Sequence, residues 1–138
     1  MTRLFLLMLL LVALITIGCR PGHSIATYSY NFPPSETNKT LSEKQMHDAI
    51  VKACVNNGWR VSMISPGSIE ATLMVRNKHT VIVNIPYTPT NYSINYKAST
   101  NMEYKVKKDG STIIHPNYNK WVARLDQSIR SNVAAGEY

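Results

Sequence analysis

The sequence predicts an α+β domain, a two-layer sandwich in which an antiparallel sheet of about five to six strands carries two helices on one face. Two segments have apolar residues spaced as on one face of a helix, and about six have them at every second position. Short turn-forming links between successive strands favour antiparallel pairing. Apolar helix stripes and an apolar sheet face are buried most simply against each other. The expected order is therefore β-α-β-β-β-β-β-α.

The composition fits one such domain and excludes several other classes of protein. The chain has 138 residues, a usual length for a single domain, and no internal repeat divides it. With 44% hydrophobic and 17% charged residues, it does not have the composition of a disordered chain. Its 2 cysteines are too few for a disulfide framework. We therefore expect one domain over residues 25–136.

The first strand and the first helix follow from two different spacings of apolar residues. Residues 26–32 alternate between apolar and polar side chains, and a Pro-Pro pair ends them. Ser42 and Gln45 form a capping-box pattern that begins a helix, and Gly58 stands where a helix-ending glycine is expected. The buried face of this helix is expected to comprise Met46, Ala49, Ile50, Ala53 and Cys54.

The middle of the chain predicts an antiparallel meander. The expected strands are residues 59–64, 69–75, 81–87, 92–97 and 102–107. Pro66-Gly67 suits a tight turn between the first two of these strands, and Asp109-Gly110 suits a turn after the last. One sheet face is apolar, and we expect water to cover the other. That exposed face is expected to carry Arg60, Ser62, Glu70, Thr72, Arg76, Asn84, Ser93, Asn95, Lys97, Lys105 and Lys107.

A second helix is expected near the C-terminal end. Asn117 is placed to cap its N-terminus, and Gly136 is placed to end it. Asp126 falls opposite the apolar stripe, on the polar side of this helix. The stripe comprises Tyr118, Val122, Leu125, Ile129 and Val133, with Trp121 at its flank.

The N-terminal residues have the features of a secretory signal peptide. Arg3 precedes an apolar run over residues 4–15, which is too short for a transmembrane helix of about 20 residues. Residues 16–19, Thr-Ile-Gly-Cys, then resemble the lipobox of bacterial lipoproteins. The resemblance implies removal of residues 1–18 and a Cys19 that carries a thioether-linked diacylglycerol and an acylated amine.

Two consequences follow from this resemblance to lipoproteins. Residues 19–24 would be a lipidated tether, since they lack an apolar pattern. Arg20 in place of Asp after the cysteine implies delivery to the outer membrane by the sorting rule of enteric lipoproteins. An alternative also stays open, in which the protein is secreted without lipid and Cys19 forms a disulfide with Cys54.

Four further segments resemble one family. They are Gly-Trp at 58–59, Pro-Gly-Ser-Ile at 66–69, Tyr-Ser-Ile-Asn-Tyr-Lys-Ala-Ser at 92–99 and Ile-His-Pro-Asn-Tyr-Asn-Lys-Trp at 114–121. In this order they resemble a family of small, uncharacterised lipoproteins of Gram-negative bacteria, over roughly residues 41–133. That family has no assigned activity or ligand. The resemblance therefore implies an envelope location and a compact domain, and it carries over no catalytic residue.

No motif predicts catalysis, a cofactor or a metal site. His47 and Cys54 lie two turns apart on the first expected helix, about 10 Å along its axis, which is too far for a nucleophile and its base. None of the 4 histidines has a second ligand at metal-binding spacing. His79 and His115 both stand at turns, so they could meet in space. We expect a protein that is not an enzyme and that holds no cofactor and no metal.

The basic excess, a formal net charge of +7, is the remaining signal for a partner. Lys97, Lys105 and Lys107 fall on the same face of the expected strands. There they could contact lipid phosphates, lipopolysaccharide or an acidic partner. Lysines on an exposed sheet edge also prevent aggregation, and this second interpretation stays open. Tyr118 and Trp121 are candidates either for the core or for contact with a partner.

These observations predict a non-catalytic binding or assembly module that is held at the outer membrane by its lipid anchor and faces the periplasm. The expected partner is an envelope protein or an anionic envelope polymer, and no nucleic acid is expected there. Two alternatives remain, a structural or stress-related lipoprotein without a specific ligand and a small envelope hydrolase. The oligomeric state is left open.

Overall fold

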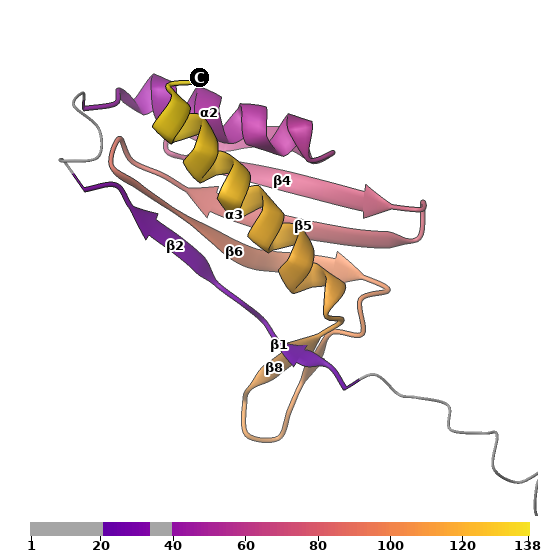
Figure 1. The fold of residues 1–138 in the computed structure, drawn as a ribbon. Helices are drawn as coiled ribbons and strands as arrows, with labels where there is room; N and C mark the ends of the chain where they lie inside the picture. Colours follow the sequence, from indigo (N-terminus) through magenta and orange to yellow (C-terminus); the bar gives the residue numbers. More distant parts are fainter. Residues whose placement is uncertain (1–20, 34–39) are drawn as a thin grey trace, which may run out of the picture.

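The computed structural model describes residues 21–33 and 40–138 (Figure 1). The expected signal peptide and the expected lipidation site, Cys19, lie outside the described residues. In chain order the elements are β1 (His23–Ser24), β2 (Tyr28–Asn31), α2 (Glu43–Asn56), β3 (Arg60–Ser65), β4 (Ser68–Val75), β5 (His79–Pro86), β6 (Asn91–Thr100), β7 (Lys105–Val106), β8 (Thr112–Ile114) and α3 (Asn117–Ala135).

Five strands form an antiparallel sheet in the order β2-β6-β5-β4-β3, which we call the main sheet. Figure 1 shows α2 and α3 on one face of it. The register follows the predicted alternation, since Ile69 lies opposite Ile85 on the covered face and both are fully buried. Their neighbours Glu70 and Asn84 pair on the open face. The predicted two-layer α+β sandwich is confirmed.

A second, smaller sheet in the order β1-β8-β7 projects from one end of the domain (Figure 1). The prediction that residues 102–107 form a strand of the meander is wrong. Only Lys105 and Val106 are in strand conformation there, and they pair with β8 alone. Met102 is 2% exposed whereas Val106 is 62% exposed. The alternation of apolar residues in this segment therefore does not mark one buried face.

The small sheet also includes residues that were expected to belong to the tether. His23 and Ser24 form β1, which pairs with β8. Asn119 of α3 holds the chain just after β1, because its side chain accepts the Ala26 N–H at 3.0 Å and donates to the Ser24 carbonyl at 2.9 Å. Residues 23 and 24, which were expected to belong to the tether, are therefore part of the fold.

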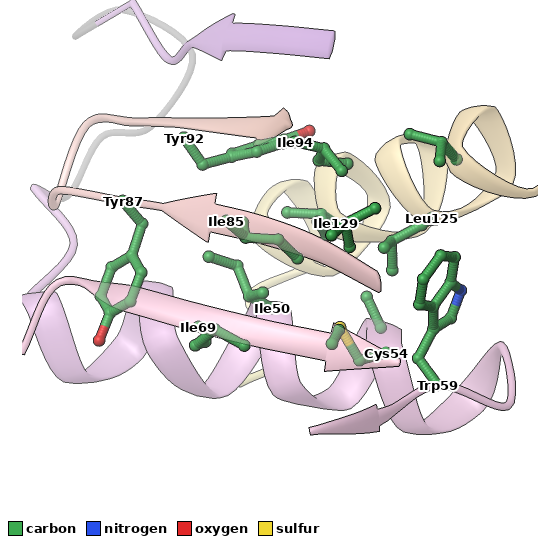
Figure 2. Packing of buried hydrophobic residues seen from close by; sticks show 14 of the residues in the cluster. Ile50, Cys54, Trp59, Ile69, Ile85, Tyr87, Tyr92, Ile94, Leu125 and Ile129 are labelled. Atoms are coloured by element: carbon green, nitrogen blue, oxygen red, sulfur yellow. The ribbon is translucent and has the colours of Figure 1, made fainter. Parts of the chain in front are cut away.

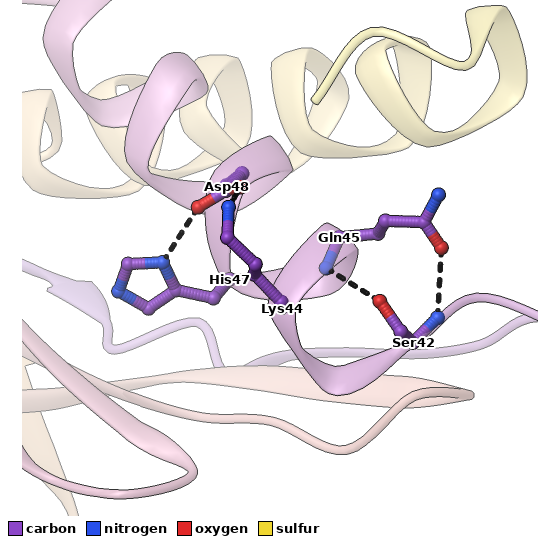
Figure 3. Close-up of polar contacts among 5 residues, drawn as sticks. All are labelled: Ser42, Lys44, Gln45, His47 and Asp48. Atoms are coloured by element: carbon purple, nitrogen blue, oxygen red, sulfur yellow. Dashed lines mark hydrogen bonds and ion pairs between the residues drawn. The ribbon is translucent and has the colours of Figure 1, made fainter.

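Helix α2 begins with the predicted capping box (Figure 3). The Ser42 hydroxyl accepts the Gln45 N–H at 3.1 Å, and the Gln45 side chain accepts the Ser42 N–H at 2.9 Å. In the next turn the Asp48 carboxylate pairs with Lys44, and it accepts a hydrogen bond from Nδ1 of His47 at 3.0 Å. Hydrogen bonds from Lys44 and then from His47 lower the pKa of Asp48. All five residues of the predicted apolar face are buried.

Helix α3 has the predicted apolar stripe and corrects two other predictions. Pro116 is its N-cap and provides no side-chain cap, so Asn117 is its first residue and not its cap. Asp126 is only 5% exposed. Its carboxylate accepts the Tyr92 hydroxyl at 2.7 Å and pairs with Arg130 at 2.9 Å, and these partners offset the burial of its charge. Helical spacing alone does not reveal a hydroxyl partner that comes from β6.

The core fills the space between the two helices and the covered face of the main sheet (Figure 2). Ile50 from α2, Ile85 from β5 and Ile129 from α3 are fully buried there. Burying one such side chain contributes about 1.5–3 kcal/mol. Asn132 joins the helices, since its amide donates to the Ala49 carbonyl at 3.0 Å. The core is therefore shared by both layers.

The buried thiol of Cys54 predicts that the fold weakens in alkaline solution. Burial raises the pKa of Cys54 to about 12 from 9.0, and burial also raises the pKa of the Tyr92 and Tyr118 hydroxyls above 10.0. The unfolded chain therefore loses these protons first. The free energy of unfolding should be constant up to about pH 9 and fall above it, by about 1.4 kcal/mol per pH unit for one group.

Urea unfolding followed by circular dichroism between about pH 7 and pH 11 measures this effect. The Cys54→Ala variant is the control, and its loss of stability should begin about one pH unit higher, where tyrosine ionises. An unfolding midpoint that stays constant to about pH 11 would contradict the prediction.

Candidate functional site

A pocket of about 390 Å³ lies where the β4–β5 turn meets the start of α3. The residues around it come from three separate stretches of the chain: the β4–β5 turn, the loop after β6 and the start of α3. It is lined by Val75, Arg76, His79, Met102, His115, Asn117 and Trp121. Its volume is within the range of about 300–1,000 Å³ that is usual for small-molecule sites.

The β4–β5 turn is held in a conformation that exposes Arg76. Arg76 and Asn77 both have left-handed backbones, with φ of 54° and 53°, and the Lys78 N–H donates to the Val75 carbonyl at 3.1 Å. Asn101 follows β6 and fixes the turn from outside, because its side chain donates to the Lys78 carbonyl at 2.8 Å. A left-handed arginine costs about 1–3 kcal/mol, and it persists only where the surrounding structure imposes it. These contacts fix the turn before any ligand binds.

Hydrogen bonds set which nitrogen of each pocket histidine carries the proton in the neutral form. Nδ1 of His79 lies 2.7 Å from the carbonyl oxygen of Asn101, which only accepts, so His79 donates from Nδ1. Nδ1 of His115 accepts the Asn117 N–H at 3.2 Å, so its proton lies on Nε2. His115 is also tied to the Met102 carbonyl by its backbone N–H, at 2.8 Å. In the neutral ring of His115, Nε2 therefore carries the proton and is the nitrogen that can donate a hydrogen bond.

The lining combines hydrogen-bond donors with apolar surface. Arg76 brings a guanidinium, Asn117 an amide and Trp121 an indole N–H. Val75 and Met102 add apolar surface. No Asp or Glu is among the described residues that line this pocket. A carboxylate or phosphate can accept charge-assisted hydrogen bonds from such a set.

The structure brings His79 and His115 together at this pocket, as the turn positions suggested. Neither lies beside a carboxylate in its lining. Within residues 21–33 and 40–138, no group of three or more His, Cys, Asp or Glu side chains is placed to hold a metal ion. Cys54 is 0% exposed and belongs to the core.

The three candidate lysines do not form one basic face. Lys97 lies at a bulge of β6 and pairs with Glu70 of the main sheet. Lys105 belongs to β7 in the small sheet, and Lys107 follows directly after this strand. The alternation of the sequence predicts that the three lysines share one face, but their strands belong to different sheets. Lys105 and Lys107 are exposed.

Tyr118 and Trp121 have different roles at the start of α3. Tyr118 is 0% exposed and packs in the core, where the Tyr96 ring meets it edge-on at 5.6 Å between ring centroids. Tyr96 also stacks on Tyr104 at 4.9 Å, so these tyrosines pack largely against one another. Trp121 is half-buried and lines the pocket. Trp121 is therefore the one candidate contact residue that the pocket includes.

No protein-family model, curated protein or solved structure matches the chain. In the part of the chain that the structure describes, no helix is both long and apolar enough to cross a membrane.

Proposed function

We propose that the protein is a lipid-anchored outer-membrane lipoprotein whose periplasmic domain binds an anionic group of an envelope component, without catalysis. The binding site is the pocket between the β4–β5 turn and the start of α3. The observation that carries this proposal is the lining, which combines the donor-bearing side chains of Arg76, Asn117, Trp121 and His115 with apolar surface. The bound group is a carboxylate or a phosphate.

The sequence supports the lipid anchor, because Cys19 follows a short apolar run and a small residue. Two or more acyl chains hold a protein stably on a membrane, whereas one chain binds marginally. The alternative, a disulfide between Cys19 and Cys54, is disfavoured by packing. The Cys54 side chain is 0% exposed, so pairing would require the core to open.

The exposed surface favours a small anionic group over a broad protein interface. A protein partner usually buries a patch with an apolar centre. The large exposed apolar side chains among the described residues come from α2, β4, the region of β7 and the C-terminal end, and single exposed residues of this kind are normal. They are Val55, Met74, Tyr104, Val106 and Tyr138.

NMR of the indole N–H groups tests the proposal, since the chain has 2 tryptophans. Trp121 lines the pocket, whereas Trp59 is 3% exposed in the core and serves as an internal control. Glycerol 1-phosphate and N-acetylmuramic acid provide a phosphate and a carboxylate, and N-acetylglucosamine is the neutral control. We expect an acidic probe to shift the Trp121 signal alone. No shift with either acid, or an equal shift with the neutral sugar, would contradict the proposal.

The variant Arg76→Asn should weaken binding of the acidic probe about tenfold or more, because a hydrogen bond to a charged group contributes about 1.5–3 kcal/mol. Asparagine adopts a left-handed backbone readily, so the turn should persist. Arg124→Asn changes an exposed residue of α3 outside the pocket lining and is the matched control. Equal affinities of the two variants in the NMR titration would remove Arg76 from the site.

A further inference from the structure

The end of the domain that carries the pocket is also the end that the proposed anchor reaches. Cys19 is separated from His23 of β1 by four peptide units, which span at most about 14 Å when extended. His23 pairs with Ile114 of β8, and the next residue, His115, lines the pocket. Figure 1 shows β1 and β8 together below the start of α3, away from α2. The anchored leaflet therefore lies close to the pocket.

The same end of the domain carries more positive than negative charge on its surface. The acidic residues of the segment 101–120 are Glu103 and Asp109, and Asp109 accepts hydrogen bonds from Ser111. The lysines of this segment are all exposed, and they outnumber the acidic residues. They are Lys105, Lys107 and Lys108 on the β7–β8 hairpin and Lys120 on α3. An anionic lipid surface attracts each such lysine by about 1 kcal/mol.

We infer that the pocket binds the headgroup phosphate of an anionic phospholipid in the leaflet that holds the Cys19 anchor, while the hairpin lysines contact neighbouring headgroups. This inference rests on the proposed anchor and on the proposed anion site. The apolar part of the lining suits such a ligand, because the half-buried Val75 can face the glycerol carbons next to the phosphate. Trp121 combines a large apolar ring with a donor, as tryptophans at membrane interfaces do.

Fluorescence quenching in vesicles tests the inference with the lipidated full-length protein. The vesicles contain phosphatidylcholine with or without about one-third phosphatidylglycerol, and a nitroxide on the headgroup of a tracer lipid quenches nearby tryptophan. The variant Trp59→Phe reports Trp121 alone, and Trp121→Phe reports the buried Trp59. In anionic vesicles we expect Trp121 to be quenched several-fold more than Trp59. Equal quenching of the two would overturn the inference.

A pair of charge variants separates the hairpin from general charge effects. The hairpin variant changes Lys105, Lys107 and Lys108 to Glu. The control variant makes the same change in net charge on α2 and β3, by replacing Lys44, Lys52 and Arg60 with Glu. The hairpin variant should lose most of the Trp121 quenching in anionic vesicles, and the control should keep it. Equal loss in both variants would contradict the role of the hairpin.

The soluble and membrane measurements distinguish the two proposals. If glycerol 1-phosphate shifts the Trp121 indole signal but anionic vesicles leave Trp121 unquenched, the phospholipid assignment fails and the anion site stands. If neither glycerol 1-phosphate nor N-acetylmuramic acid shifts the signal, the proposed function itself fails.

Discussion

Replacing Cys19 with serine is expected to move nearly all of the protein from the membrane fraction to the soluble fraction while the domain stays folded. Serine cannot form the thioether to diacylglycerol, and the described fold begins after residue 20. One acyl chain gives a membrane association constant of only about 10⁴ M⁻¹, and each further buried CH₂ contributes about 0.8 kcal/mol. Losing all the chains should therefore abolish anchoring. Fractionation, followed by circular dichroism of the released protein, measures both expectations.

The matched control for this change is Cys54→Ser, which removes the other cysteine of the chain. It should cost some stability, because the site is buried, yet the protein should stay in the membrane fraction. Membrane association that persists in Cys19→Ser would contradict lipid anchoring. A disulfide between Cys19 and Cys54 in the native protein would support the secreted alternative instead.

The largest effect on stability is expected for Tyr118→Ala, at about 3–5 kcal/mol, by analogy with other large aromatic residues in cores. Tyr118 is fully buried near the start of α3 and packs against Tyr96. Removing its ring would leave a cavity at the junction of α3 and the main sheet. The change in the urea midpoint at neutral pH, with an unchanged slope, measures the loss.

Tyr118→Phe is the informative control because it keeps the ring. The Tyr118 hydroxyl is buried without a hydrogen-bond partner among the described residues. Leaving such a group unsatisfied costs about 1–3 kcal/mol, so its removal should be neutral or stabilising. A loss of more than about 1 kcal/mol in Tyr118→Phe would show that the hydroxyl has a partner in solution, such as a bound water.

The helices and the main sheet were predictable because local patterns determine them. Ser42 and Gln45 cap α2 through contacts between residues three apart, and a left-handed Gly136 ends α3. The second sheet was predictable only in part. The Asp109-Gly110 turn that joins β7 to β8 has a local signature, whereas the two-residue strand β1 pairs with β8 from far away in the chain, and no local spacing encodes that pairing.

The pocket, too, could be predicted only in part from the sequence. From the sequence, Trp121 is a contact candidate, and the turn positions of His79 and His115 allow these two residues to meet. Arg76 is expected on the exposed sheet face and Met102 in a strand, because neither residue type reveals its distant neighbours. The contact from Asn101 to Lys78 brings these segments together, and a bond between residues this far apart leaves no local pattern.

The most direct test of an anion site at the start of α3 is capture in living cells. A photoreactive amino acid replaces Asn117 in the pocket, and a second protein carries it at the exposed Arg124 as control. Mass spectrometry after irradiation identifies what each position captures, and it also measures the mass of the Cys19 peptide. We expect position 117 alone to capture a phosphate- or carboxylate-bearing envelope component, on a chain whose Cys19 carries diacylglycerol. Equal capture at both positions, or protein adducts alone at position 117, would contradict the proposed function.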